Sequence, residues 1–312
     1  MTKRALLIGC NYTATPSVQL AGCISDIVNA RNTLIDAYGY QDVNIYMLRD
    51  DDASRLPTKA KIIYYLTQVL SSSSANDTVW IHYSGHGTQI KSLDSDEIDK
   101  LDECIVPCDY ATAGIITDNE LYALLKNAKP RILLLFDSCH SGTGCDLQYS
   151  INYNNGTLSK VVNNKKFIPS PNIVMISGCQ DAQTSADAYD NMSKRAVGAF
   201  TQTLLETLRT SDHNIAILPL YAKLCANLKS FGFTQMPVLS STVPIPIFQF
   251  SRANANGSPI LTTNASTVTT SAATTTTATN PTKKDIVLTG NVVAASPVTR
   301  TLRGLMTSLL GQ

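Results

Sequence analysis

The 312-residue chain lacks several features that mark common functional classes. It has no run of Lys or Arg, and its formal net charge of +1 gives no concentrated basic face for nucleic acid. No segment approaches the roughly 18 consecutive apolar residues that a transmembrane helix needs. The apolar run at 5–9 is too short for the core of a secretory signal peptide. These absences predict a cytoplasmic protein whose main partner is neither nucleic acid nor a membrane.

The cysteines do not form the dense pattern of a disulfide scaffold. The eight of them are spread over positions 10, 23, 104, 108, 139, 145, 179 and 225. Without a secretory signal, we expect mostly reduced thiols. Cys104 and Cys108 are four residues apart, but no second Cys/His pair has zinc-ligand spacing, so a structural zinc is not expected.

What the sequence does contain is 44% hydrophobic residues, enough for a substantial core. Apolar runs rich in β-branched residues occur at 5–8, 43–48, 78–83, 132–136 and 172–177. Helical spacing of apolar residues occurs at 20–38, 58–70, 118–127, 198–210 and 215–230, and Thr117 with Glu120 has the pattern of a capping box. This alternation predicts an α/β fold, with a mostly parallel central β-sheet flanked by helices on both faces.

Composition also divides the chain into parts. An Asn-rich stretch at about 148–170 is predicted to be an exposed loop between a larger part, about 1–147, and a smaller part, about 171–250. Residues 262–282 contain eleven threonines and no aromatic side chain, which is too little apolar surface to fold. We therefore expect one folded domain over 1–250 and a disordered tail over 251–312.

Two predicted strands end in clusters of polar residues. One runs into Ser84, Gly85, His86 and Gly87, and the other into Asp137, Ser138, Cys139 and His140. Ligands of parallel sheets bind beyond the carboxyl ends of the strands, so both clusters are predicted to lie in one site.

The chain has only four histidines, which can be compared as general bases. His82 lies within an alternating strand, where we expect it to be packed. His140 directly follows Cys139, and successive side chains diverge. His213 lies in a Ser-Asp-His-Asn connection typical of a helix cap. His86 is the best candidate, because the glycines on either side let the backbone bend and a substrate approach.

Cys139 is the matching candidate for a nucleophile. An imidazole activates a thiol by favouring the thiolate, which attacks a carbonyl. The backbone N–H groups of Gly87 and Cys139 are candidate donors to the oxyanion. From the residues alone, the alternative is that Cys139 is a core thiol, since buried cysteines are common.

Six motifs occur in order between about residues 4 and 250: ALLIGCNY, LAGCISD, HYSGHGTQ, DECIVPCD, LLLFDSCHSG and SGCQDAQTSAD. Together they resemble the metacaspases, a family of caspase-like cysteine peptidases. The resemblance implies a caspase-haemoglobinase-like fold, a dyad of His86 and Cys139, and cleavage after Arg or Lys. The chain is similar to a compact member without an N-terminal prodomain, and such members are generally monomeric.

The resemblance also implies an acidic substrate pocket. Asp26 and Asp137 match its carboxylates, with Cys23 and Ser84 beside them, and Asp187 is a further candidate nearby. Carboxylates suit a cationic side chain, because a buried guanidinium or ammonium group must be paired. The alternatives are a solvated helix residue for Asp26 and a turn former for Asp137.

Calcium activation is a further implication of the resemblance. Residues 94–103 are acidic but lack the pattern of an EF-hand. The family's calcium positions match Asp102, Asp118, Asn119 and Asp146. Asn119 stands where a second Asp is common, so we expect weaker affinity. The alternative is a solvated acidic loop with an N-cap Asp.

The sequence thus predicts a calcium-activated cysteine endopeptidase that acts on proteins or peptides with Arg or Lys at the cleaved bond. Lys165 and Lys166 form a candidate self-cleavage site, with Lys160 and Arg195 as alternatives. A rival interpretation is a catalytically weak caspase-like scaffold or clearance protein that acts by binding. An intact dyad and an acidic pocket argue against this rival.

Overall fold

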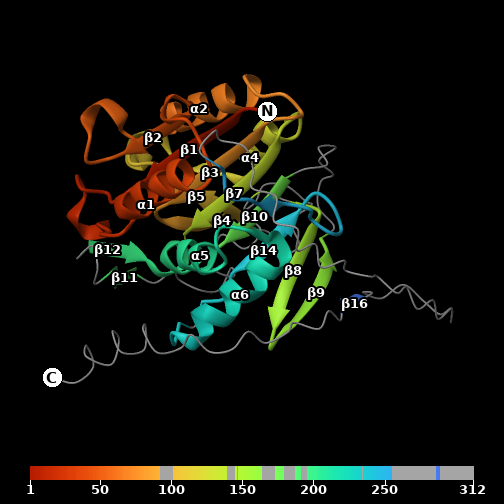
Figure 1. Ribbon diagram of the computed structural model, residues 1–312. Coiled ribbons are helices and arrows are strands. Elements are labelled where there is room, and N and C mark those ends of the chain that lie inside the picture. The colour runs from red at the N-terminus through yellow and green to blue at the C-terminus, as the bar shows by residue number, and fades with distance from the viewer. Residues whose placement is uncertain are drawn as a thin grey trace.

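A computed structural model describes residues 1–91, 101–138, 145, 147–163, 173–178, 187–190, 195–233, 235–254 and 286–288. Its centre is a nine-stranded mixed sheet (Figure 1). Five neighbouring strands are parallel: β2 (Ile45–Arg49), β1 (Lys3–Gly9), β3 (Thr78–Ser84), β7 (Arg131–Asp137) and β10 (Ile173–Ser177). Antiparallel strands continue the sheet beyond β10: β14 (Val238–Ser241), β8 (Tyr149–Asn154), β9 (Thr157–Val162) and β16 (Ile286–Leu288). The five predicted strands are confirmed as the parallel half.

The prediction of an exposed loop at about 148–170 is partly wrong. Its first residues form the hairpin β8–β9, in which Ile151 is fully buried. The two-residue turn is Asn155-Gly156, and both residues have positive φ, 47° and 91°. Asn-Gly favours such a turn because Gly and Asn tolerate left-handed backbone, and this signal outweighs the polar composition.

Within the predicted tail, Ile286–Leu288 pairs with β9 as the edge strand β16. The Thr-rich stretch at 262–282 lies outside the described residues.

Helices cover both faces of the sheet (Figure 1). One face packs against α1 (Cys23–Asp36), α5 (Ala199–Thr210) and α6 (Ile217–Ser230), and the other against α2 (Lys59–Ser71) and α4 (Asp118–Leu125). All five predicted helices are present, and Thr117 and Glu120 form the predicted capping box. No helix of the described residues is long and apolar enough to cross a bilayer.

Shorter elements surround the sheet. They are the 3-10 turns η1 (Pro16–Val18), η2 (Asp42–Asn44) and η3 (Ala53–Arg55), the helix α3 (Tyr110–Ala113), and three small antiparallel sheets: β4 (Gly87–Lys91) with β5 (Leu101–Ile105) and β6 (Ile116–Thr117), β11 (Asp187–Asp190) with β12 (Arg195–Gly198), and β13 (Ile215–Ala216) with β15 (Gln249–Phe250).

Alternation along the strands separates two cores. In β3, Trp80 packs on the α1/α5/α6 side, whereas Val79 and Ile81 pack on the α2/α4 side. Successive side chains of a strand point to opposite faces, so His82 and Ser84 lie on the same side as Trp80. Both therefore face α1 and α5, which determines the composition of the site described below.

Asp77, just before β3, holds the start of the sheet together. Its carboxylate accepts hydrogen bonds from the backbone N–H groups of Thr2, at 2.5 Å, and Ser74, at 2.9 Å, and lies 3.4 Å from Arg4 Nη1. The hydrogen bond from Ser74 is the largest of these effects, which together lower the pKa of Asp77 to about 2.

We expect Asp77→Asn to lower the free energy of unfolding at neutral pH by about 1–2 kcal/mol. The folded-state pKa lies below the unfolded value of about 3.9, so the contribution is present above that value and lost as the pH falls from about 4 to about 2. Urea unfolding across this range should show a flatter pH dependence for the variant. Asp36→Asn, at an exposed position, is the control. Identical slopes for Asp77→Asn and wild type would contradict the assignment.

Candidate active site

His86 lies in the bend between β3 and β4, and its ring is held by a backbone carbonyl. Its Nε2 is 2.8 Å from the carbonyl oxygen of Val18, in η1. A carbonyl only accepts, so Nε2 carries the hydrogen and donates it. In the neutral ring Nδ1 is then the acceptor. The imidazole therefore has one defined nitrogen that can take up a proton.

The backbone of His86 is held by two buried tyrosines. Its N–H donates to Tyr12 Oη at 2.9 Å, and its carbonyl accepts from Tyr83 Oη at 2.7 Å. Tyr12 Oη also donates to the carbonyl of Val106 at 2.7 Å, and Val106 N–H donates to Tyr83 Oη at 3.1 Å. Burial raises the pKa of both phenols, so both remain neutral donors. The Tyr12 ring lies 4.7 Å from the imidazole centroid.

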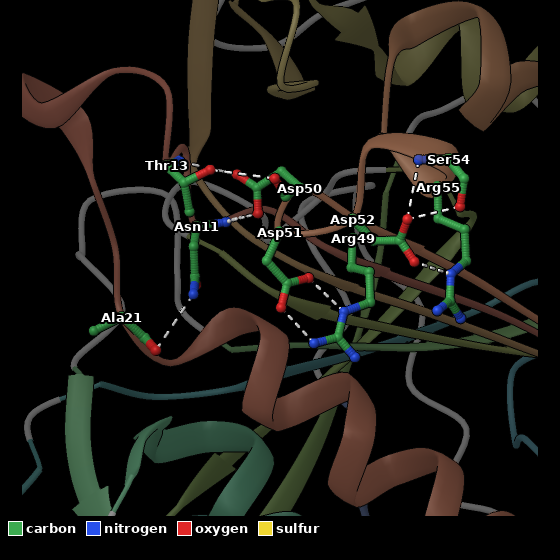
Figure 2. Close-up of polar contacts among 9 residues, drawn as sticks. All are labelled: Asn11, Thr13, Ala21, Arg49, Asp50, Asp51, Asp52, Ser54 and Arg55. Atoms are coloured by element: carbon green, nitrogen blue, oxygen red, sulfur yellow. Dashed lines mark hydrogen bonds and ion pairs between the residues drawn. The ribbon is translucent and has the colours of Figure 1, made fainter.

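The loop that carries Tyr12 is anchored by Asp50 (Figure 2). Asp50 accepts from the backbone N–H groups of Asn11, at 3.0 Å, and Thr13, at 3.1 Å. These contacts flank Tyr12, whose φ of 56° is unusual for a residue other than glycine. The neighbouring acidic residues have other partners: Asp51 pairs with Arg49, and Asp52 with Arg55. Asp50 thus supports the strained backbone that presents Tyr12 to His86.

Asp26, Ser84 and Asp137 come together on the α1/α5 side of the sheet, all at most 5% exposed. Ser84 Oγ donates to Asp26 Oδ2 at 2.7 Å. The backbone N–H of Gly198 donates to Asp26 Oδ1 at 2.8 Å. A Cβ at Gly198 would clash with Asp137 Oδ2 and lie 2.8 Å from Asp26 Oδ2, so both carboxylates face the same point. The structure therefore brings the predicted pocket carboxylates together.

The other predicted pocket residues lie close by. Cys23 begins α1, and its backbone N–H donates to Asn11 Oδ1 at 3.0 Å. The backbone of Asp187 pairs with Gly198 across β11 and β12. Sequence reasoning missed two residues here, Gly198 and Thr201, which contact the carboxylates. Nothing in their sequence context signals such contacts with residues more than 60 positions away.

Each described thiol with a shifted pKa has it raised, which disfavours the reactive thiolate. Burial is the largest cause that raises the pKa of Cys10 and Cys23, and it raises the pKa of Cys104 to about 12, Cys108 to about 11 and Cys225 to about 12. These five cysteines are free thiols, and Cys145 is also buried. The candidate nucleophile Cys139 and its neighbour His140 lie outside the described residues.

The two other histidines have non-catalytic surroundings. His82 is fully buried, and burial lowers its pKa to about 3, so the predicted packing within the strand is confirmed. His213 follows α5 with a φ of 54°, and partial burial lowers its pKa.

The candidate calcium ligands are partly brought together. Asp118, fully buried at the start of α4, accepts from the backbone N–H groups of Glu103, at 3.1 Å, and Asn119, at 2.7 Å. Asp102 precedes Glu103 in β5, and its buried Oδ1 has no hydrogen-bond partner within the described part of the chain. Asp146 lies outside it, and the described residues alone contain no group of three potential metal ligands. Carboxylate oxygens such as these, including the buried Asp102 Oδ1, are suitable ligands for a hard divalent cation.

The candidate cleavage sites differ in their surroundings. Lys160 is in β9, between β8 and β16. The backbone of Arg195 lies opposite that of Asp190 in the small antiparallel sheet of β11 and β12. Lys165 and Lys166 lie outside the described residues.

Solved structures with the same arrangement define the fold as caspase-like. Caspase-1 from Spodoptera frugiperda matches 79% of this chain and 90% of its own with a TM-score of 0.51 and 13% identity. A Geobacter sulfurreducens protein matches 83% and 97% with a TM-score of 0.55 and 21% identity. These likenesses support the fold alone.

Sequence comparisons then specify the family. The family model "Metacaspase, peptidase C14 domain" matches residues 3–148. Metacaspase-1 of Scheffersomyces stipitis is 32% identical over 294 residues, which cover 78% of this chain and 71% of that protein. Metacaspase-1B of Neosartorya fischeri is 34% identical over 291 residues, covering 78% and 70%. The chain belongs to the metacaspase family and is a cysteine-type endopeptidase.

We expect Tyr12→Phe to lower the free energy of unfolding by about 1–3 kcal/mol, because the half-buried N–H of His86 loses its acceptor and the buried carbonyl of Val106 loses a donor. Urea unfolding measures the change. Tyr64→Phe is the matched control, since Tyr64 is 55% exposed. Equal losses in the two variants would show that the Tyr12 hydroxyl does not support His86.

Proposed function

We propose that this metacaspase cleaves peptide bonds after Arg or Lys, with His86 and Cys139 as the dyad. The observation that carries the specificity is the convergence of Asp26 and Asp137 at Gly198. Two buried carboxylates at one point favour a cation, and a guanidinium can engage both with parallel hydrogen bonds. The carboxylate of a substrate Asp side chain would instead be repelled.

The placement of the strands supports the dyad. β3 and β7 are parallel neighbours, and Ser84 is in register with Asp137. His86 and Cys139 each follow two residues later in the sequence. Loops after the carboxyl ends of neighbouring parallel strands commonly form one ligand site, which supports pairing these two residues. The raised pKa values of the described thiols also favour Cys139 over those cysteines as nucleophile.

We assign the steps of the reaction to these residues as follows. His86 Nδ1 takes the proton of the Cys139 thiol, while the Val18 carbonyl holds Nε2–H and stabilises the imidazolium. The thiolate attacks the substrate carbonyl, and the N–H groups of Gly87 and Cys139 donate to the oxyanion. The imidazolium then protonates the leaving amine, which leaves an acyl-enzyme. Water attacks the thioester with His86 as base, and the thiol leaves with the proton.

Peptides that differ only in Arg, citrulline or Asp at the cleaved bond test this proposal. Citrulline has nearly the shape of Arg but no charge. We expect the wild type to prefer Arg, and Asp137→Asn to lower kcat/KM for the Arg peptide about 30- to 1000-fold, as for a broken buried charge pair. Cys139→Ala is the blank. Wild-type activity in Cys139→Ala, or equal cleavage of Arg and citrulline peptides by wild type, would refute the proposal.

We further propose that Asp102, Asp118, Asn119 and Asp146 hold a calcium ion that activates the enzyme. The buried Asp118 carboxylate and the buried Asp102 Oδ1 support this assignment. A bound ion supplies charge neutralisation for these carboxylates and ties β5 and α4 to the chain that follows Cys139.

Asp118→Asn should weaken calcium binding at least roughly tenfold, because it removes one ligand charge while nearly preserving shape. Isothermal titration calorimetry on the Cys139→Ala background measures binding without self-digestion. Asp36→Asn, an exposed change, should bind as the parent does. Unchanged binding in Asp118→Asn would place the ion elsewhere.

Self-processing after Lys165 or Lys166 is proposed on the same specificity. The alternatives, Lys160 and Arg195, lie in paired strands, whose backbone a peptidase could reach only after unpairing. The free thiols of Cys10, Cys23, Cys104, Cys108 and Cys225 support a reducing, cytoplasmic setting, and we propose that the enzyme acts there as a monomer.

A further inference from the structure

A buried polar chain connects β3 to the substrate pocket and takes no part in the proposed chemistry. His82, which is fully buried, has its Nε2 3.1 Å from Thr201 Oγ1, on α5. Thr201 Oγ1 is 2.8 Å from Asp137 Oδ2, and Thr201 N–H reaches the same oxygen at 3.1 Å. Three residues from three elements thus form a row that ends on a pocket carboxylate.

The chemistry of the groups fixes the direction of these hydrogen bonds. A carboxylate only accepts, so the single hydrogen of the Thr201 hydroxyl points to Asp137. Thr201 Oγ1 then accepts from His82, which therefore carries its hydrogen on Nε2. His82 Nδ1 has no hydrogen-bond partner in the described part of the chain. The opposite tautomer would bury an unpaired N–H there, which is rare in proteins.

The row supports the negative charge of the pocket without neutralising it. Burial lowers the pKa of His82 to about 3, so the ring remains neutral at physiological pH. A Lys or Arg at this position would also hold Asp137, but would compete with the cation of a substrate. A neutral donor that acts through a hydroxyl holds the carboxylate without adding a positive charge beside it.

We propose that His82 and Thr201 are positioning residues for Asp137 and determine how well the pocket distinguishes a charged from an uncharged side chain. This inference rests on the proposed Arg/Lys specificity. The hydroxyl of Thr201 holds Oδ2, and His82 orients that hydroxyl. Loss of the row should therefore weaken recognition of the cation and leave the dyad unaffected.

Thr201→Val tests the row, because valine keeps the shape of threonine but lacks the hydroxyl. We expect its KM for the Arg peptide to rise roughly tenfold, the size of one lost hydrogen bond to a charged group, with kcat changed less than about twofold. Cleavage of the citrulline peptide and alkylation of Cys139 by iodoacetamide should stay near the wild-type level. Thr201→Ser, which restores the hydroxyl, should recover most of the Arg preference.

A second pair of variants keeps the test decisive if Thr201→Val folds poorly by circular dichroism. Gln can place an amide N–H near the position of His82 Nε2, whereas Leu cannot. His82→Gln should retain more of the Arg-over-citrulline preference than His82→Leu. Equal losses on both peptides, or an unchanged preference in Thr201→Val, would overturn the positioning role. If the wild type itself shows no Arg preference, the proposed specificity fails instead.

Discussion

The parallel pairing of β3 with β7 is the constraint on which the site depends. Its register aligns Ser84 with Asp137, so the residues that follow each strand emerge at one edge of the sheet. Seven aligned pairs fix this register, and a slip by one residue would turn His82 and Ser84 to the α2/α4 side. The pairing of β3 with β7 thus positions Ser84 and Asp137 in the buried interior and places His86 just beyond the end of β3.

Burial acts in opposite directions on the groups around this edge. It keeps His82 and the two tyrosine hydroxyls neutral, so that they serve as fixed donors and acceptors. It also holds the described thiols of Cys10 and Cys23 in the unreactive form. The carboxylates of Asp26 and Asp137 are supported by hydroxyl and backbone N–H donors. Hydrogen-bond donors from several elements therefore hold both carboxylates within the buried part of the site.

Periodicity predicted the parallel strands and the helices, and the polar residues at two strand ends predicted one site around Ser84 and Asp137. These are local signals. Asp26 was assigned to the same pocket only through the resemblance to metacaspases. The hairpin over β8 and β9 was missed because its Asn-Gly turn lies in a stretch of polar composition. Gly198 and Thr201 were missed because their role depends on tertiary contacts with Asp26 and Asp137. No local pattern encodes such contacts.

The order of strands around β10 has a mechanical consequence. β10 and β14 lie between β7 on one side and the hairpin strand β8 on the other, and both of these flanking strands precede β10 in the chain. A break in the chain anywhere between β9 and β10 would cut the covalent link but none of these ladders. The two fragments would remain associated through the backbone hydrogen bonds between their strands. An enzyme cleaved there would therefore remain a single non-covalent complex under native conditions, and its two fragments would separate on denaturation.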